Sequence, residues 1–543
     1  MSVPMNCGDA IVQSLLQHGV DTVFGLPGVH TYPFFDALYR AGDAVRVITP
    51  RHEQTTAYMA FGYAKSTGKV GVYSVVPGPG MLNTSAALCS AYGASAPVFC
   101  VTGQVPSDYI GSGKGHVHEL PDQLATLRLL TKWADRIDHP AEAPRLVAEA
   151  IRQALSGRPR PVALEVPWDI LTQKAPLEIT APLGKYPDIE PDPDEITKAV
   201  NILKDAKNPM IMVGGGAVDA SAEVLALAEM LQAPVACYRS GRGIVSDEHY
   251  LGFNCASGMK RWPETDVLIG IGSRLQLIWF GWQARPNVKT ILIDIDPQQR
   301  ARLKPDVGIV GGAKTSVQAL TASLERVSSP RASRREEFEA LKQRTWCEIQ
   351  KVTPHVQFLE VIRQVLPRDG FLVEEICQAG FTSLFAFPVY APRTFVTCGH
   401  QATLGFGFPT ALGVKVANPN KAVVSLAGDG GFQFGIQELA TAAQYGINLV
   451  VIVYNNGAYF NVMRDQQERF NGRLQSSLLR NPDFLKVAEG FGVRGYKAAT
   501  PVALKAALES ALSESTPALI EVPIELGTES SPWEFLQAPP PRK

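Results

Sequence analysis

Cysteine is scarce in this sequence, and its spacing matches no cysteine-based motif. The 543 residues contain eight cysteines, widely scattered and without a C-x-x-C pair. This spacing predicts neither a zinc site nor a disulfide framework. The N-terminal segment also lacks the basic region of a secretory signal and has Asp9 within its apolar part. We therefore expect a cytoplasmic protein.

Excess positive charge and long apolar runs are also missing. The net charge is -1 at pH 7, so the composition does not favour binding to nucleic acid or to an anionic membrane. The best apolar candidate, "LVVIVY" near Leu449, is too short to cross a bilayer. We expect a small-molecule ligand and neither a nucleic-acid nor a membrane partner.

Short apolar segments alternate with helical stretches along most of the chain. Segments such as "VGVYSVV", "PVALEVP", "VLIGIG" and "NLVVIVY" are typical of strands in buried parallel sheets. The chain is also too long for one hydrophobic core. Residues 174–195 and 328–351 lack the alternation and are predicted to be connections. We expect an α/β protein with three doubly wound parallel-sheet domains over residues 1–173, 195–327 and 355–543.

Two polar turns follow successive strands of the third domain. "AVVSL" leads into "AGDGGF", and "NLVVIVY" leads into "NNGAY", with a helical segment between them. Asp429 and Asn456 should therefore meet at the carboxyl edge of a parallel sheet, where open α/β sheets bind ligands. Their oxygens suit Mg²⁺ or Ca²⁺ beside a phosphate. Either motif alone reads as a turn, but the pair predicts a metal and diphosphate site.

The Asp429-to-Asn456 spacing resembles the GDG and NN signature of thiamin-diphosphate enzymes. The resemblance extends over nearly the whole chain and is to the superfamily of acetohydroxyacid (acetolactate) synthase-like enzymes and 2-keto acid decarboxylases. The motifs that carry it are "FGLPG", "RHEQTTAYMAFGY", "GPGMLN", "TGQVP" and "NPDFLKVAEGFG". It implies a pyrimidine-binding first domain, a central domain and a diphosphate-binding third domain. It also implies that Asp429, Asn456 and the Ala458 carbonyl hold Mg²⁺.

The same resemblance implies which residues surround thiamin diphosphate. Glu53 matches the glutamate that activates the aminopyrimidine; alone, it would read as a helix-start acid. Leu404 matches the bulky residue that bends the cofactor. The other implied cofactor contacts are Gly28, Gly78, Asn83, Gln378, Ala402, Gly428, Gly430, Gly431 and Tyr459.

The chain departs from the synthases around the substrate. "GSRLQLIWFGW" stands where the synthases have "RFDDR", so FAD is not expected. Gln104, His116 and Val462 are the residues predicted to face the reaction. His116 and His118 lie near the histidine pair of pyruvate decarboxylases, but one residue further apart, and are either proton carriers or a surface pair.

We expect decarboxylation of a 2-keto acid and ligation of the remaining fragment to a second carbonyl, by a homodimer or homotetramer. The alternatives are a non-ligating benzoylformate-type decarboxylase, a 2-hydroxyacyl-CoA lyase or an oxalyl-CoA decarboxylase-like enzyme. From other classes, the chain could be a non-catalytic paralogue that binds the cofactor. It could also be a nucleotide-dependent dehydrogenase built on the "VGGGA" turn at residues 213–217.

Overall fold

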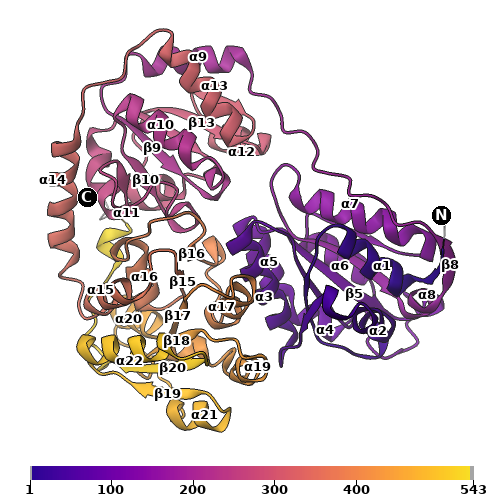
Figure 1. Ribbon diagram of the computed structural model, residues 1–543. Coiled ribbons are helices and arrows are strands. Elements are labelled where there is room, and N and C mark those ends of the chain that lie inside the picture. The colour runs from indigo at the N-terminus through magenta and orange to yellow at the C-terminus, as the bar shows by residue number, and fades with distance from the viewer. Residues whose placement is uncertain (1–2, 538–543) are drawn as a thin grey trace.

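The computed structural model describes residues 3–537 and contains three α/β domains (Figure 1). Each domain has a six-stranded sheet whose neighbouring strands are all parallel, flanked by helices. The prediction of three parallel-sheet domains is confirmed. The Pro-rich tail at residues 538–543, which the sequence predicts to be frayed, lies outside the described residues.

The N-terminal sheet has the strand order β3-β2-β4-β5-β7-β6. Its strands are β2 (Thr22–Gly25), β3 (Arg46–Ile48), β4 (Gly71–Val75), β5 (Val98–Gln104), β6 (Trp133–Arg136) and β7 (Val162–Pro167). Its helices are α1 (Cys7–Gln17), α2 (Tyr32–Arg40), α3 (Glu53–Thr67), α4 (Pro79–Asn83), α5 (Ser85–Ala94), α6 (Gln123–Leu130), α7 (Ala143–Leu155) and α8 (Trp168–Thr172). A two-stranded pair, β1 (Val3–Asn6) with β8 (Lys174–Leu177), lies across the predicted boundary at residue 173.

Burial explains why the central strands of this sheet are apolar throughout. Val72 and Phe99 pack in one core with α1, α2 and α7, whereas Tyr73 and Cys100 pack in another core with α3 and α5. Because helices cover both faces, alternate residues of a strand are all buried, and a continuous apolar run results.

The C-terminal sheet repeats this topology in the order β16-β15-β17-β18-β20-β19. Its strands are β15 (Phe371–Val373), β16 (Phe395–Val396), β17 (Val423–Gly428), β18 (Val450–Asn455), β19 (Arg494–Lys497) and β20 (Ala518–Pro523). Its helices are α15 (His355–Val365), α16 (Gln378–Ala386), α17 (Gly407–Ala417), α18 (Asp429–Phe432), α19 (Leu439–Tyr445), α20 (Phe460–Arg469), α21 (Phe484–Gly490) and α22 (Pro501–Ser513).

The central sheet has a different order, β11-β10-β9-β12-β13-β14. Its strands are β9 (Pro209–Val213), β10 (Val235–Cys237), β11 (Gly252–Phe253), β12 (Val267–Ile271), β13 (Lys289–Asp294) and β14 (Val307–Val310). Its helices are α9 (Pro193–Leu203), α10 (Ser221–Leu231), α11 (Cys255–Arg261), α12 (Pro297–Leu303) and α13 (Ala313–Glu325). The first strand lies in the middle, as in dinucleotide-binding sheets, and the strand order reverses between β9 and β12.

The N-terminal and C-terminal domains share one hydrophobic core, because α3 and α17 lie side by side between their sheets (Figure 1). Glycine makes this approach possible. A Cβ on Gly62 of α3 would collide with the Thr410 carbonyl of α17, and one on Gly413 of α17 would collide with the Met59 carbonyl of α3. The predicted connection at residues 328–351, which leads to the C-terminal domain, contains α14 (Arg335–Ile349). Within residues 3–537, no helix combines the length and apolarity needed to cross a membrane.

Candidate active site

Three neighbouring strands bring three predicted site residues to one edge of the C-terminal sheet. β15, β17 and β18 are adjacent and parallel. Asp429 directly follows β17, Asn456 directly follows β18, and Gln378 begins the helix after β15. The sequence prediction that Asp429 and Asn456 share a carboxyl edge is confirmed, and this is the edge where such sheets bind ligands.

The Asp429 carboxylate is buried and held by three donors. Oδ1 accepts from the Gly430 N–H at 2.9 Å, and Oδ2 accepts from the Gly457 N–H at 2.8 Å and from Asn481 Nδ2 at 2.6 Å. Burial raises the pKa of Asp429, its hydrogen bonds oppose the rise, and the negative charge of Glu529 adds to it. A cation at this position would therefore relieve an unfavourable concentration of negative charge.

The turn that contains Asn456, Ala458 and Tyr459 is fixed on both sides. Asn456 Nδ2 donates to Glu529 Oε2 at 2.7 Å, and its Oδ1 accepts from the Ala458 N–H at 3.1 Å. The Tyr459 N–H donates to the Ser477 carbonyl at 2.8 Å. The Tyr459 ring lies against Gly430, where a Cβ would collide with it. The turn is thus packed directly on the GDGG segment.

Gln378 supplies the sharpest test of whether a diphosphate fits here. Its side chain is buried, and neither its Oε1 nor its Nε2 has a hydrogen-bond partner within residues 3–537. Leaving a buried amide unpaired is costly. The preceding residue, Cys377, lies beside Gly428, so the amide begins α16 next to the GDGG segment. Phosphate oxygens at this helix N-terminus would satisfy the amide, and the residues fit the diphosphate.

No group of three or more His, Cys, Asp or Glu side chains in the described chain could hold a metal by itself. Mg²⁺ usually binds one or two carboxylates and completes its shell with water and phosphate oxygens. The Asp429 carboxylate and the Asn456 amide oxygen therefore fit a metal that binds together with a diphosphate.

The N-terminal domain presents its predicted residues at its own carboxyl edge. Glu53 begins α3 and is half-buried, and its Oε2 accepts from Asn83 Nδ2 at 3.0 Å. Gly78 follows β4 with a left-handed φ of 60° and lies against the His118 carbonyl, a conformation and a contact that favour glycine. Gly28 follows β2 and lies against the Val76 side chain. Two residues that the resemblance assigns to the cofactor, Glu53 and Asn83, are thus in contact.

Gln104 lies at the end of β5, but its amide is turned into the protein. Nε2 donates to the buried Glu165 carboxylate at 3.2 Å, and Oε1 accepts from the Val105 N–H at 2.8 Å. Gln123 and Arg136 also donate to Glu165. In this structure Gln104 belongs to a buried polar network and does not present its amide to a substrate.

His116 and His118 belong to a cluster whose third member was not predicted. The His30 ring centroid lies 5.0 Å from that of His118 and 6.0 Å from that of His116. His30 is 1% exposed, whereas the other two are half-buried. Burial and the two neighbouring rings lower the pKa of His30 to about 4. The sequence feature that could have indicated His30 is its position two residues after the "FGLPG" turn.

The remaining predicted residues are less enclosed. Val462, on α20, is 52% exposed. Ala402 is exposed with a left-handed φ of 49°, and Leu404 is half-buried. Gly431 lies near the buried Glu375 side chain. Two residues that hold the metal-site turns were missed as site residues: Asn481, in the quoted "NPDF" motif, and Glu529, which no sequence pattern indicated.

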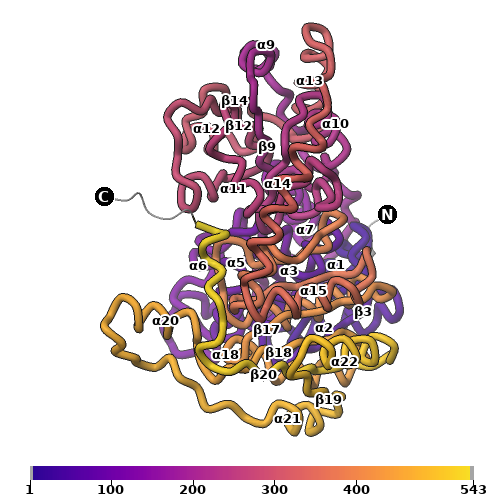
Figure 2. The backbone as a smooth tube through the Cα atoms, turned by 90° about the vertical axis from the view of Figure 1, so that its left-hand side faces the viewer, coloured from indigo at the N-terminus to yellow at the C-terminus, as the bar shows by residue number. Residues whose placement is uncertain are grey.

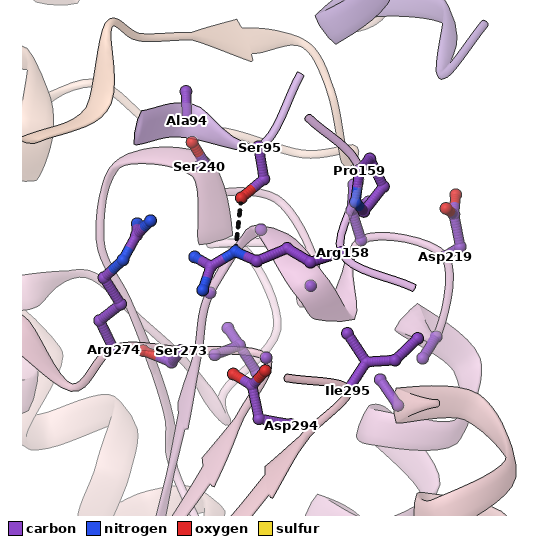
Figure 3. Close-up of a pocket in the computed structure, with 18 of the residues that line it drawn as sticks. Ala94, Ser95, Arg158, Pro159, Asp219, Ser240, Ser273, Arg274, Asp294 and Ile295 are labelled. Carbon is purple, nitrogen blue, oxygen red and sulfur yellow. Dashed lines mark hydrogen bonds between the residues drawn. The ribbon is translucent and has the colours of Figure 1, made fainter. Parts of the chain in front are cut away.

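A separate cavity of about 500 Å³ lies where the three domains meet. Figure 3 shows Arg158, Arg274 and Asp294 around this space, with Arg158 Nε donating to Ser95 Oγ at 2.9 Å. Gly214, Gly215 and Gly216, which follow β9, also line it. None of the residues predicted to hold thiamin diphosphate is among its lining residues. The cavity is cationic and lies at the point where the central strand order reverses.

Comparison with known proteins identifies the family. Residues 5–126 match the N-terminal TPP binding domain of thiamine pyrophosphate enzymes, residues 196–320 match their central domain, and residues 376–522 match their C-terminal TPP binding domain. The chain is 32% identical to the probable acetolactate synthase large subunit of Methanocaldococcus jannaschii, over 99% of this chain and 94% of that protein. It is 33% identical to the probable 2-ketoarginine decarboxylase of Pseudomonas aeruginosa, over 90% of this chain and 88% of that protein. It is also 33% identical to the acetolactate synthase large subunit of Haemophilus influenzae, over 93% of this chain and 92% of that protein. The chain therefore belongs to the thiamine pyrophosphate enzymes.

Proposed function

We propose that this enzyme uses thiamin diphosphate and Mg²⁺ to decarboxylate a 2-keto acid and to ligate the remaining fragment to a second carbonyl. One observation is central to the proposal: Asp429, Asn456 and the buried amide of Gln378, which has no partner in the described part of the chain, lie at one sheet edge. The named relatives support chemistry on 2-keto acids. When bound, the cofactor supplies a carbon nucleophile and an electron sink.

The C-terminal domain would bind the phosphate end. Asp429, the Asn456 amide oxygen and the Ala458 carbonyl would hold Mg²⁺. Gln378 and the backbone N–H groups of Gly430 and Gly431 would bind diphosphate oxygens, since N–H groups at a helix start favour negative charge.

The N-terminal domain would supply the proton transfer. Asn83 donates to Glu53 Oε2, which leaves Oε1 to share a proton with the aminopyrimidine ring. A positioned carboxyl group is a suitable general acid or base for this purpose. Gly28 and Gly78 would let the backbone lie close to the cofactor.

The site would need two copies of the chain. The Glu53–Asn83 hydrogen bond is open to solvent in a single chain, as are Ala402 and Val462. A second copy facing these edges would exclude water from them, and the family resemblance implies such an arrangement. We therefore propose a homodimer or homotetramer, and a cytoplasmic location. Sedimentation velocity on the purified protein tests the assembly, and a monomer that turns over substrate at full rate would contradict it.

A non-ligating decarboxylase is the second candidate, favoured by the histidine cluster. His116 and His118 pack with His30 at the carboxyl edge of the N-terminal sheet, where imidazoles could protonate and release the fragment. The exposed Val462, which has no proton to donate, favours ligation instead.

A substrate screen decides between the two. Purified enzyme is incubated with a series of 2-keto acids, with and without aldehyde acceptors, and all products are identified by NMR. Ligated products that require both Mg²⁺ and thiamin diphosphate are expected. Free aldehyde as the main product would support the decarboxylase, and no cofactor-dependent turnover of any 2-keto acid would contradict both.

We propose that the cavity at the domain junction holds no flavin required for this reaction. The reason is that "GSRLQLIWFGW" stands where the synthases have "RFDDR", the segment associated with their flavin. Its arginines and glycine turn would still accommodate the phosphates of a nucleotide. Chromatography of the small molecules released from denatured protein tests this. Stoichiometric FAD whose removal abolishes turnover would contradict the proposal.

A further inference from the structure

The C-terminal segment at residues 525–537 connects the candidate metal site to the rest of the molecule. In Figure 2 it is the yellow stretch of the tube that rises from the C-terminal sheet towards the central domain. The Ser530 N–H donates to the Thr353 carbonyl at 2.8 Å. Trp533 Nε1 donates to Asn461 Oδ1 at 3.0 Å, and the Leu536 carbonyl lies against Gly281 of the central domain. The segment is thus attached at several points.

Glu529 is the residue of this segment that reaches the metal site. Its Oε2 accepts from Asn456 Nδ2 at 2.7 Å, and its Oε1 bonds His355 Nε2 at 2.7 Å. The Glu529 and His355 side chains are 2% and 1% exposed. A carboxylate buried to this degree needs partners, and both of its oxygens have one.

These contacts fix the orientation of the Asn456 amide. An ionised carboxylate can only accept hydrogen bonds, so Asn456 must turn its Nδ2 towards Glu529 and its Oδ1 away. Rotating the amide would place Oδ1 against the carboxylate. The orientation that Glu529 enforces is the one in which Asn456 offers an oxygen to a metal ion. Glu529 also adds negative charge near Asp429.

We propose that Glu529, held by His355, is a positioning residue that orients Asn456 for Mg²⁺ and so couples the C-terminal segment to the metal site. The inference rests on the proposed function, because Mg²⁺ binding there is itself proposed. It adds a residue that lies 73 positions after Asn456 in the sequence. Outer-shell residues of this kind typically change metal affinity by roughly 10- to 100-fold when replaced.

Two substitutions separate positioning from packing. Glu529→Met keeps the approximate volume and removes both acceptors. Glu529→Gln keeps an oxygen for Asn456 Nδ2, and its NH₂ can donate to His355 if the imidazole proton moves to Nδ1, which has no partner in the described chain. Ser530→Ala is the matched control, since Ser530 is the next residue of the same segment and, among residues 3–537, forms hydrogen bonds only with residues 351 and 353.

The readout is the Mg²⁺ concentration for half-maximal binding of thiamin diphosphate to apo protein, measured by calorimetry, with circular dichroism to establish folding. We expect Glu529→Met to raise this concentration at least about 10-fold, Glu529→Gln to change it less than about threefold, and Ser530→Ala to leave it unchanged. Wild-type affinity in Glu529→Met would overturn the inference, and so would an equal shift in Ser530→Ala. Wild-type protein that binds the cofactor without needing Mg²⁺ would instead contradict the proposed function.

A second measurement uses wild-type protein, in case Glu529→Met does not fold. Coupling is reciprocal, so Mg²⁺ with thiamin diphosphate should slow amide hydrogen exchange in residues 525–537 at least about threefold relative to the apo protein. Unchanged exchange in this segment, with slowed exchange in the turn around Asn456, would overturn the coupling.

Discussion

The Glu53 side chain offers a test of the proposed proton transfer that changes little else. Glu53→Gln preserves volume and can still accept the Asn83 hydrogen bond, but an amide does not ionise and so cannot act as a general acid or base at neutral pH. We expect kcat to fall by roughly two to four orders of magnitude, with a modest loss of cofactor affinity. Steady-state turnover measures it, with Glu142→Gln at another helix start as the control. Near-wild-type turnover would disprove the role of Glu53.

Asp429 tests the metal site. Asp429→Ala removes the charged ligand that would face the diphosphate, so we expect cofactor affinity to lose its dependence on Mg²⁺. Titrating thiamin diphosphate into apo protein with and without Mg²⁺ measures the change. Asp483→Ala, which removes an exposed helix cap of the same domain, is the control. If Asp429→Ala keeps the wild-type dependence on Mg²⁺, the GDGG segment is only a turn.

Val462 tests the balance between ligation and release. Because its side chain is 52% exposed, a glutamate should be accommodated without refolding the region, and it would place a proton donor beside the reaction. With pyruvate, we expect Val462→Glu to shift products from ligated compounds towards acetaldehyde, as measured by NMR. Val462→Gln, which has no acidic proton, should resemble wild type. An identical shift in both variants would argue against proton donation.

Two loops of the N-terminal domain, rather than any single residue, create the histidine cluster. The loop after β2 places His30 against His116 and His118. Burial, followed by these two rings, lowers the pKa of His30 from 6.5 to about 4. The unfolded chain therefore binds more protons between these pH values, and stability must fall as the pH drops through this window.

We expect the titration of His30 to lower the unfolding free energy by about 2 kcal/mol as the pH falls from 7 to 5. His30→Phe keeps a ring in the same place but does not titrate. The unfolding free energy of this variant should therefore fall less than that of the wild type between pH 7 and pH 5, by the amount that His30 contributes. Urea unfolding at the two pH values measures this, and the exposed His139→Asn serves as the control. The same pH dependence in His30→Phe and wild type would show that His30 is not the group responsible.

At the scale of the whole molecule, the α3–α17 contact joins two domains into one core. Gly62→Ala would drive a methyl group into the Thr410 carbonyl, so either the helices separate or the backbone shifts. We expect a loss of about 2 kcal/mol or more of unfolding free energy. Gly490→Ala is the matched control, because within residues 3–537 no atom beyond its chain neighbours and its own helix backbone lies within 4 Å of its Cβ position. Equal stability of the two variants would mean that the contact is not tightly packed.

Residues close to strand ends could be located from the sequence. Asp429 and Asn456 follow short apolar runs that are typical of buried strands, and successive parallel strands end at the same sheet edge. Glu53 and Asn83 were each assigned to the cofactor site through the family resemblance, and their hydrogen bond of 3.0 Å was seen only in the structure. The three-domain α/β fold followed from the alternation of apolar and helical segments, because that pattern reflects burial of both sheet faces.

Other features depended on tertiary packing. Gln104 ends its strand as expected, but the buried Glu165 draws its amide inward. His30 meets His118, and Glu529 meets both Asn456 and His355, across many intervening residues. The sequence by itself determined the elements, their order and the polar turns that end the strands, because these follow from local backbone preference and the period of burial. Only the tertiary structure decided which distant side chains complete each site, because hydrogen-bond partners of buried polar groups are chosen by packing and not by spacing along the chain.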